Sequence, residues 1–250
     1  MKTARSLSRL LVILASLLPD LLALRRFDPD SGHTDAPTRL ARKLVSLGPL
    51  FVKLGQILST RPDLLPKAYV TRLAALQERA PQIDFETVRT VIETELGRPL
   101  DTAFASFEPT PVAAASLAQV HKASLVDGTP VAVKVQRPGL QALFVRDLDA
   151  LGLGLRFLRL LAPRRIRRTN LPAFLEEFRR YSLGELDFRA EARVMERFRA
   201  NLAGKDGVRV PKTFPDHASA RVLTMDWVEG MRLSEATATL SGQARSRLVD

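Results

Sequence analysis

Two charged residues far apart in the sequence are the strongest candidates for chemistry in this 250-residue chain. Lys134 ends the strand-like run Val-Ala-Val-Lys at 131–134, where a fixed ammonium group could bind phosphate oxygens. A lysine used in this way needs a carboxylate partner on a nearby helix, and Glu191 is the best candidate. The alternative interpretation is a solvated helix face on which Glu191 pairs with Arg189 and Arg193.

An alanine-rich segment precedes this lysine. Its residues Ala113, Ala115, Ala118 and Val120 follow the spacing G-x-G-x-x-G-x-V of the loop that covers ATP in protein kinases, with alanine at each glycine position. Alanine is the smallest residue with a Cβ, so the backbone can still approach a phosphate. Tight packing also produces such segments, but the order of loop, turn and lysine strand favours a nucleotide site. The expected phosphate-binding residues are Ala113, Ala114, Ala115, Ser116, Val120 and Lys134.

A second strand-like run, at 222–230, could contact the adenine ring. In a kinase, a large residue and three hinge residues follow such a strand between the two lobes. Met225 fits the large residue, and the backbone carbonyl of Asp226 and the amide of Val228 would meet the adenine edge. The alternative is a buried edge strand without a ligand.

We expect a small β-sheet to position these candidate nucleotide-binding residues. The β-prone runs at 116–125 and 130–136 flank Asp127-Gly128, which predicts a hairpin. Strands are also expected at 209–214 and 220–228. Helical periodicity predicts one helix from Phe144 to Leu158, a second that Asn170 caps, and a third over 185–202. The last twenty residues also show a helical pattern that reaches Asp250 without a stop signal.

The first hundred residues predict helices. Leucines and Phe51 recur at steps of three and four from 40 to 58, with a kink expected at Gly48-Pro49. A second helix should run from Pro66 to about 78, and a third should begin after Asp84 and end at Gly97. We expect 28–38 to form a loop, and we interpret 1–24 as an amphipathic or core helix rather than a signal peptide or an interfacial membrane helix.

Three motifs together resemble the UbiB/AarF family of atypical kinase-like proteins, which includes the mitochondrial coenzyme Q kinases. The run at 51–56, continued through Ser59–Asp63, resembles the KxGQ motif of that family. Ala113–Ser116 resembles its alanine-rich loop. Glu185–Glu191 resembles its ExD motif followed by the lysine-pairing glutamate. The resemblance extends from about residue 35 to the end of the chain.

The resemblance implies an α+β fold: a protein-kinase-like small lobe, with an antiparallel sheet and an αC-type helix, and a helical N-terminal KxGQ extension. We expect an N-terminal helix and linker at 1–38, the KxGQ extension at 39–110, and the small lobe with a helical insertion and the hinge at 111–230. The truncated large lobe would begin at 231–250 and be mostly missing.

The resemblance also implies a set of site residues. The KxGQ helix would pack over the active site and hold Lys53 near the phosphates, paired with Glu185 or Asp187. The catalytic set would then be Lys134, Glu191, Lys53, Glu185 and Asp187. The cofactors would be ATP and Mg²⁺, with the Mg²⁺ ligands beyond residue 250, because no H-x-D-x-x-x-x-N sequence stands here and the dipeptides Asp127-Gly128 and Asp206-Gly207 are turns rather than D-x-G. We therefore expect no metal ligand within this chain.

Composition and net charge exclude some classes of functional site and favour one class of partner. The chain has no cysteine and three histidines, so disulfide frameworks, thiolate nucleophiles and cysteine-zinc sites are excluded. The net charge of +11 and the basic cluster at 164–168 favour a polyanionic partner such as an anionic membrane surface. Nucleic acid ranks last, because aromatic residues make up only 6% and no such motif is present.

Two functions remain open. The first is the N-terminal portion of an ATP-binding kinase or ATPase that supports ubiquinone biosynthesis, with quinone-biosynthesis proteins or lipids as partners. The second is a non-catalytic pseudokinase fragment that binds nucleotide, lipid or a protein. Whether the chain is itself an enzyme stays undecided. We expect a cytoplasmic protein, with peripheral membrane association as an alternative.

Overall fold

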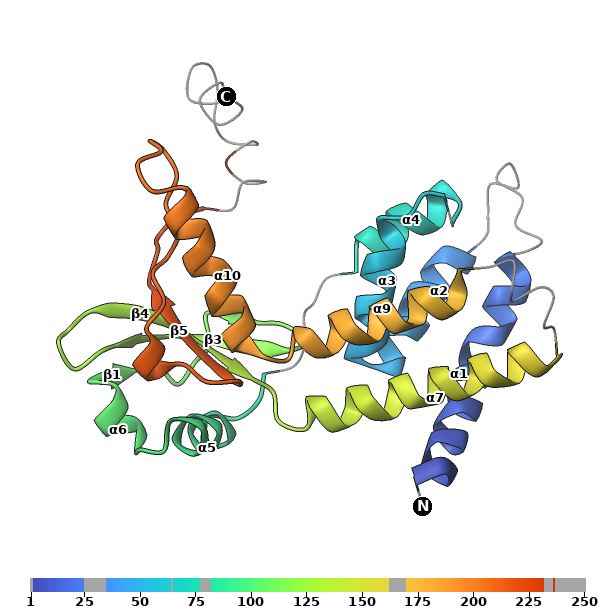
Figure 1. Cartoon of the computed structure of the whole chain (residues 1–250), viewed down its shortest axis with the longest axis horizontal. Coiled ribbons are helices and arrows are strands. Elements are labelled where there is room, and N and C mark those ends of the chain that lie inside the picture. Colours follow the sequence, from blue (N-terminus) through green and yellow to red (C-terminus); the bar gives the residue numbers. More distant parts are fainter. Residues whose placement is uncertain are drawn as a thin grey trace.

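The computed structural model describes residues 2–24, 35–63, 65–76, 82–161, 170–231 and 236. Figure 1 shows two bodies beside each other, one made of helices and one built around a sheet. The helical body contains α1 (Lys2–Leu24), α2 (Ala36–Leu47), α3 (Pro49–Ser59), α4 (Lys67–Ala74), α7 (Leu140–Leu161) and α9 (Leu171–Gly184). The sheet body contains α5 (Phe85–Leu96), α6 (Leu100–Ala103), β1 (Ser106–Phe107), β2 (Ala113–Ala114), β3 (Ala118–Ser124), β4 (Pro130–Gln136), α10 (Phe188–Asn201), η2 (Pro215–His217) and β5 (Val222–Asp226).

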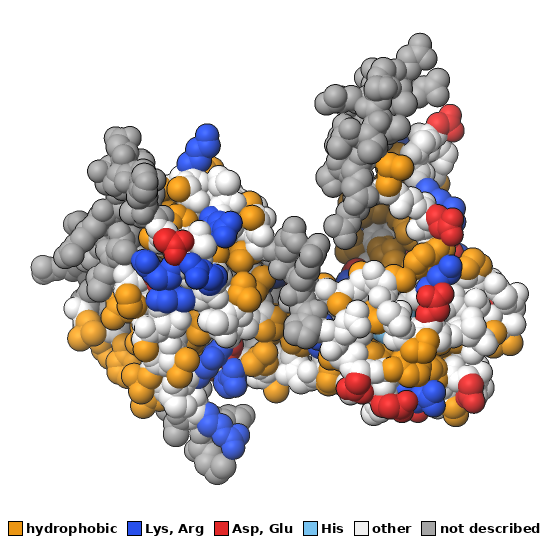
Figure 2. Space-filling model, turned by 180° about the vertical axis from the view of Figure 1, so that it is seen from behind, with side chains coloured by type: hydrophobic (Ala, Val, Ile, Leu, Met, Phe, Trp, Pro, Cys, Tyr) orange, Lys and Arg blue, Asp and Glu red, His pale blue; other side chains and the backbone are white. Residues whose placement is uncertain are grey.

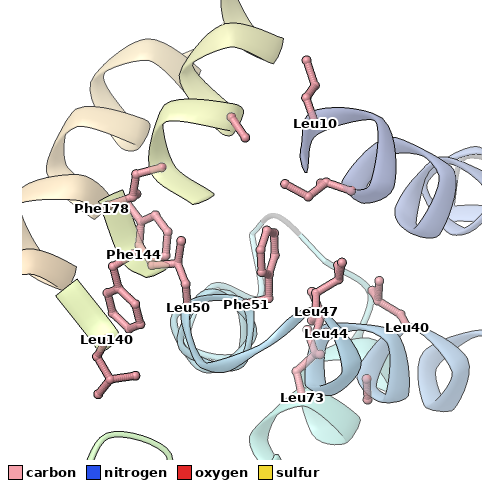
Figure 3. Close-up of a cluster of buried hydrophobic side chains, with 14 of the residues drawn as sticks. Leu10, Leu40, Leu44, Leu47, Leu50, Phe51, Leu73, Leu140, Phe144 and Phe178 are labelled. Carbon is pink, nitrogen blue, oxygen red and sulfur yellow. The ribbon is translucent and has the colours of Figure 1, made fainter. Parts of the chain in front are cut away.

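The core of the helical body is formed by the periodic leucines of the N-terminal region. Leu44, Leu50 and Phe51 are buried in it, and Figure 3 shows them meeting side chains of α1, α4, α7 and α9. The expected kink is a full break, because Gly48 has φ +114° and separates α2 from α3. Gly55 lies against this core so closely that an added Cβ would stand 2.6 Å from a methyl group of Leu76.

Helix α1 is part of this core. Leu10 and Ile13 are buried among the leucines, and the Arg9 guanidinium binds the buried carboxylate of Asp147 on α7 at 2.8 and 2.9 Å. A second buried carboxylate, Asp20, binds side chains of α2. The interpretation of 1–24 as an amphipathic or core helix agrees with α1, which buries one side in this core and leaves Leu11 on the other side exposed. No helix among the described residues is long and apolar enough to cross a membrane.

The sheet is antiparallel throughout, with strand order β1-β3-β4-β5 and β2 paired to β3. Successive side chains of a strand point to opposite faces of the sheet, so the strand register determines which side chains share a face. Val131, Val133 and Val135 of β4 are buried on one face, in a cluster with α5. Lys134 and its neighbours therefore belong to the other face, on which α10 packs.

Several predicted elements are confirmed with shifted bounds, and others are wrong. The hairpin and the helix between the Asp84 cap and Gly97 form as predicted, with Gly97 at φ +66°. The strand at 209–214 is wrong, because the chain there makes only an isolated bridge from Thr213 to Met225. Within the predicted loop 28–38, residues 36–38 already belong to α2, and 28–34 lie outside the described residues.

The helix predicted over 185–202 begins later, at Phe188, since 185–187 form a turn after α9. The helix predicted from Pro66 ends at Ala74. Most of the predicted C-terminal helix and the basic cluster at 164–168 lie outside the described residues.

Candidate functional site

Lys134 on β4 and Glu191 on α10 form an ion pair. The lysine Nζ donates to both carboxylate oxygens, at 2.8 and 2.7 Å, and it lies 4.6 Å from the centre of the Phe188 ring. The lysine side chain is 25% exposed and the glutamate 40%, so the pair borders solvent rather than the core. Of the two interpretations of Glu191, the lysine partner is the one that the geometry supports.

The turn between α9 and α10 sets the position of Glu191. Asp187 caps α10 by accepting from the Arg189 amide at 3.1 Å, and the Phe188 amide donates to the Ala220 carbonyl at 2.9 Å. The buried Gln136 of β4 donates from Nε2 to the Leu186 carbonyl at 2.8 Å. These bonds fix the first turn of α10 against the sheet, which places Glu191 beside Lys134.

The alanine-rich segment forms a tight turn between β2 and β3. The Ala115 amide donates to the Ala118 carbonyl at 2.8 Å, and Ala114 pairs with Gln119 across the two strands. Arg137 closes the turn from the end of β4. Its Nε donates to the Ala115 carbonyl, and its amide donates to the Leu117 carbonyl, each at 2.9 Å. Ser116, at the tip of this turn, is partly buried.

Strand register brings four of the predicted nucleotide residues to one face of the sheet: Ala113, Val120, Lys134 and Met225. Val120 pairs with Lys134, and Met225 pairs with Ala132, two residues before the lysine on β4. Side chains that are directly opposite in an antiparallel pair share a face, so the loop strand, the lysine and Met225 line one surface. The half-exposed Val228 follows β5 at the border of this surface.

Asp226 ends β5, and its backbone amide and its carboxylate are bonded to the preceding segment. Its amide donates to the Lys212 carbonyl at 2.9 Å, and its carboxylate accepts from the Lys212 amide at 3.0 Å. These bonds hold the end of β5 in place. The backbone carbonyl of Asp226, which is the group expected to meet the adenine edge, takes no part in these two bonds.

Lys53 of α3 forms an ion pair with Glu185, the C-cap residue that directly follows α9. The lysine Nζ also lies 5.1 Å from the centre of the Tyr181 ring. A hydrogen bond to Glu185, together with burial, raises the pKa of the Tyr181 hydroxyl. Of the two predicted partners, Glu185 therefore holds Lys53. Asp187 instead binds the Arg189 guanidinium at 2.8 and 3.1 Å, which holds the pKa of this carboxyl below its usual range.

The site thus consists of two lysine–glutamate pairs, whose carboxylates come from one short stretch, 185–191. The KxGQ helix supplies one lysine and the sheet supplies the other. The profile of the ABC1 atypical kinase-like domain matches residues 75–249. The chain belongs to the ABC1 atypical kinase-like family. The resemblance to UbiB/AarF proteins is thereby confirmed.

Curated relatives of this ABC1 chain include two Arabidopsis thaliana proteins. ACTIVITY OF BC1 COMPLEX KINASE 7, chloroplastic, is 39% identical over 224 residues, which are 87% of this chain and 31% of that protein. ACTIVITY OF BC1 COMPLEX KINASE 3, chloroplastic, is 43% identical over 206 residues, or 80% and 28%. The chain therefore spans about a third of the length of the curated relatives it matches.

A solved structure shares the fold. It is the complex of Rv3197 with erythromycin from Mycobacterium tuberculosis, with a TM-score of 0.58 and 27% identity over 82% of this chain and 53% of that one. This likeness confirms the expected α+β kinase-like architecture of the ABC1 chain. The boundaries between the four predicted segments stay predictions.

Sequence reasoning missed three residues of the site. Gln136 and Arg137 fix the turns before α10 and between β2 and β3, and Tyr181 contacts the second lysine–glutamate pair. The sequence offered a signal for the first two, because the polar residues Gln136 and Arg137 directly follow the last buried valine of β4, Val135. No group of three His, Cys, Asp or Glu residues in the described ranges could hold a metal ion.

Proposed function

We propose that this ABC1-family chain binds ATP on the sheet face that carries Lys134. The Lys134–Glu191 pair supports this most directly, because a lysine held by a helix carboxylate is the arrangement that orients nucleotide phosphates in kinases. The small side chains of Ala113–Ser116 leave the backbone of the neighbouring turn accessible to phosphate oxygens. Met225, Asp226 and Val228 would border the adenine.

The residues present fit the nucleotide. Lys134 would bind phosphate oxygens while Glu191 fixes the ammonium group, and Lys53, held by Glu185, would lie toward the same phosphates. ATP supplies the transferable phosphoryl group when it is bound. Mg²⁺ would be held by residues in the portion of the relatives that this chain does not match. We place the whole protein in ubiquinone, or isoprenoid quinone, biosynthesis because of its motifs, with proteins or lipids of that process as partners.

Nucleotide-induced stabilisation tests this proposal. At a hundredfold excess over the dissociation constant, a ligand stabilises the folded state by about 2.7 kcal/mol, so ATP should raise the melting temperature of the 250-residue chain by several degrees. Lys134→Met should remove most of that rise, whereas Lys205→Met, at an exposed position after α10, should keep it. An equal rise in both variants would remove Lys134 from the proposed role.

A second proposed activity is peripheral binding to an anionic membrane surface. Leu7, Leu11, Leu14 and Leu18 recur at steps of four and three along α1 and are 42–59% exposed. Leu161, at the end of α7, is 83% exposed. Figure 2 shows hydrophobic side chains over this part of the helical body, with Lys and Arg side chains nearby. An apolar stripe flanked by basic residues suits a bilayer of anionic lipids.

Vesicle sedimentation tests the membrane surface separately. The chain should sediment with vesicles that contain phosphatidylserine, and the bound fraction should fall as salt rises, because the attraction is partly electrostatic. The double variant Leu11→Asp/Leu14→Asp should lose binding. Equal binding to pure phosphatidylcholine, or unchanged binding of the double variant, would contradict this assignment.

A further inference from the structure

A cavity of about 350 Å³ lies between the end of α3 and the middle of α9. Neither the proposed nucleotide residues nor the exposed stripe of α1 lines it. This volume is at the lower end of the range for small-molecule sites. Its wall combines apolar, aromatic and basic side chains, among them Ile57, Phe174, Phe178, Tyr181, Arg61 and Arg180.

The apolar wall of the cavity is suited to a flat ring. Phe174 and Phe178 lie one helical turn apart on α9 with their rings parallel, at an angle of 1° and a centroid distance of 6.2 Å. Phe178 is buried and therefore fixed, while Phe174 is partly exposed at the cavity. Ile57 of α3 lines the same space. Aromatic side chains bind another ring by offset stacking or by edge-to-face contact.

The polar part of the wall favours a single negative charge. Arg61 already binds Asp63, at 2.8 and 2.7 Å, whereas no ion pair joins Arg180 to any of the residues that the structure describes. Glu177 is the acidic residue of the wall. Because Asp63 already neutralises Arg61, Arg180 is the guanidinium of the wall that is left for a ligand, and its geometry is the one that binds a carboxylate.

Tyr181 connects the cavity with the KxGQ motif. One side of this residue lines the cavity, while Lys53 lies 5.1 Å from the centre of its ring and its hydroxyl interacts with Glu185. A molecule that contacts the Tyr181 ring would therefore alter the surroundings of the Lys53–Glu185 pair. The proposed nucleotide face is not needed for this contact.

We propose that the cavity between α3 and α9 binds a small aromatic monoanion, with its ring against Phe174 and Tyr181 and its charge on Arg180. Occupation of the cavity changes the environment of the Lys53–Glu185 pair through Tyr181. This site is separate from the proposed ATP site, and its test uses no nucleotide, so either proposal can fail alone.

Calorimetric titration of the 250-residue chain with 2-naphthoate tests the site. The neutral isostere 2-naphthamide has the same rings without the charge, and we expect it to bind at least tenfold more weakly. Arg180→Met should abolish that preference. Arg179→Met, on the same helix but bonded to Asp149, should retain it. Absence of naphthoate binding, or equal binding of acid and amide to the wild type, would overturn the proposal.

The link to the KxGQ motif has its own readout. The chain contains two tyrosines, so ring-¹³C-tyrosine labelling gives one signal for Tyr181 and one for the fully buried Tyr69. Naphthoate should shift the Tyr181 signal and leave the Tyr69 signal in place, and Lys53→Met should alter the size of that shift. Binding that leaves the Tyr181 signal unchanged would contradict the proposed contact.

Discussion

At the residue scale, the Lys134–Glu191 pair is expected to matter for ligand binding more than for folding. Both side chains are partly exposed, and exposed ion pairs contribute only about 0–1 kcal/mol to stability. Bound phosphates would need the ammonium group in one position, which the carboxylate provides. The cost of losing the carboxylate should therefore appear in nucleotide affinity.

Glu191→Gln should weaken ATP binding about tenfold or more while changing the free energy of unfolding by less than about 1 kcal/mol. Titration calorimetry gives the first quantity and urea unfolding the second. Glu176→Gln, an exposed position on α9, is the matched control and should change neither. A large loss of stability with unchanged ATP affinity would show that the Lys134–Glu191 pair stabilises the fold and does not contribute to nucleotide binding.

Glu196 on α10 gives a prediction about pH. Its carboxylate accepts from the amide and the hydroxyl of Thr213, each at 2.9 Å, and from Arg199, which lowers its pKa from 4.5 to about 2. Because the folded pKa is depressed, the stabilisation is present above pH 4.5 and is lost as pH falls toward 2. Glu196→Gln should remove that part of the pH dependence.

Unfolding by urea between pH 6 and pH 2 measures this effect. The difference in stability between wild type and Glu196→Gln should be largest near pH 6 and should shrink below pH 4.5. A difference that is independent of pH across this window would contradict the assignment.

At the scale of elements, the turn between α9 and α10 positions both glutamates. Gln136 bonds the Leu186 carbonyl from a buried position, so removal of its amide leaves that carbonyl without this donor. Such a group costs about 1–3 kcal/mol. Gln136→Leu should therefore lower the free energy of unfolding by this amount and weaken ATP binding, because Glu191 follows the turn.

Gln141→Leu, at an exposed position of α7, is the control and should have little effect on either quantity. Urea unfolding and titration calorimetry of the two variants make the comparison. Equal effects of the two substitutions would show that the Gln136 bond does not position the turn.

Local signals explain which elements could be predicted. Asp84 and Gly97 bound α5 because a cap and a left-handed glycine are local chemistry. The 185–187 turn could not be located from periodicity, because it is fixed by bonds to β4 and to Ala220, distant in sequence. The strand expected at 209–214 failed for the same reason: its pairing depends on tertiary contacts, and only Thr213 makes one bridge.

The candidate site was predictable in part. The pairing of Lys134 with Glu191 was a hypothesis from the sequence, with a solvated helix face as its alternative, and the family resemblance implied a carboxylate partner for Lys53. The choice of Glu185 over Asp187 could not be predicted, because it depends on which residue follows α9 and which caps α10. Arg137 and Tyr181 act through contacts that no sequence spacing reveals.

At the scale of the whole molecule, the chain has two main hydrophobic cores, one in the helical body and one beneath the sheet. Phe51 is buried in the first and Val133 in the second. We therefore expect two unfolding transitions. Phe51→Ala should lower the stability of the helical body by about 3–5 kcal/mol, and Val133→Ala that of the sheet body by about 2 kcal/mol.

The single tryptophan, Trp227, follows β5 and reports on the sheet body. Its fluorescence transition should shift in Val133→Ala and stay nearly unchanged in Phe51→Ala, whereas circular dichroism of the helices should shift in Phe51→Ala. A single transition that moves equally in both variants would show that the two bodies unfold as one.

The sheet face that carries Lys134 is the proposed ATP site, and photolabelling with 8-azido-ATP tests this proposal. The adenine should lie beside Met225–Val228, so the label is predicted in the tryptic peptide 222–232, with competition by ATP and loss in Lys134→Met. Label confined to other peptides, or label in this peptide that neither ATP nor Lys134→Met diminishes, would contradict ATP binding on this face.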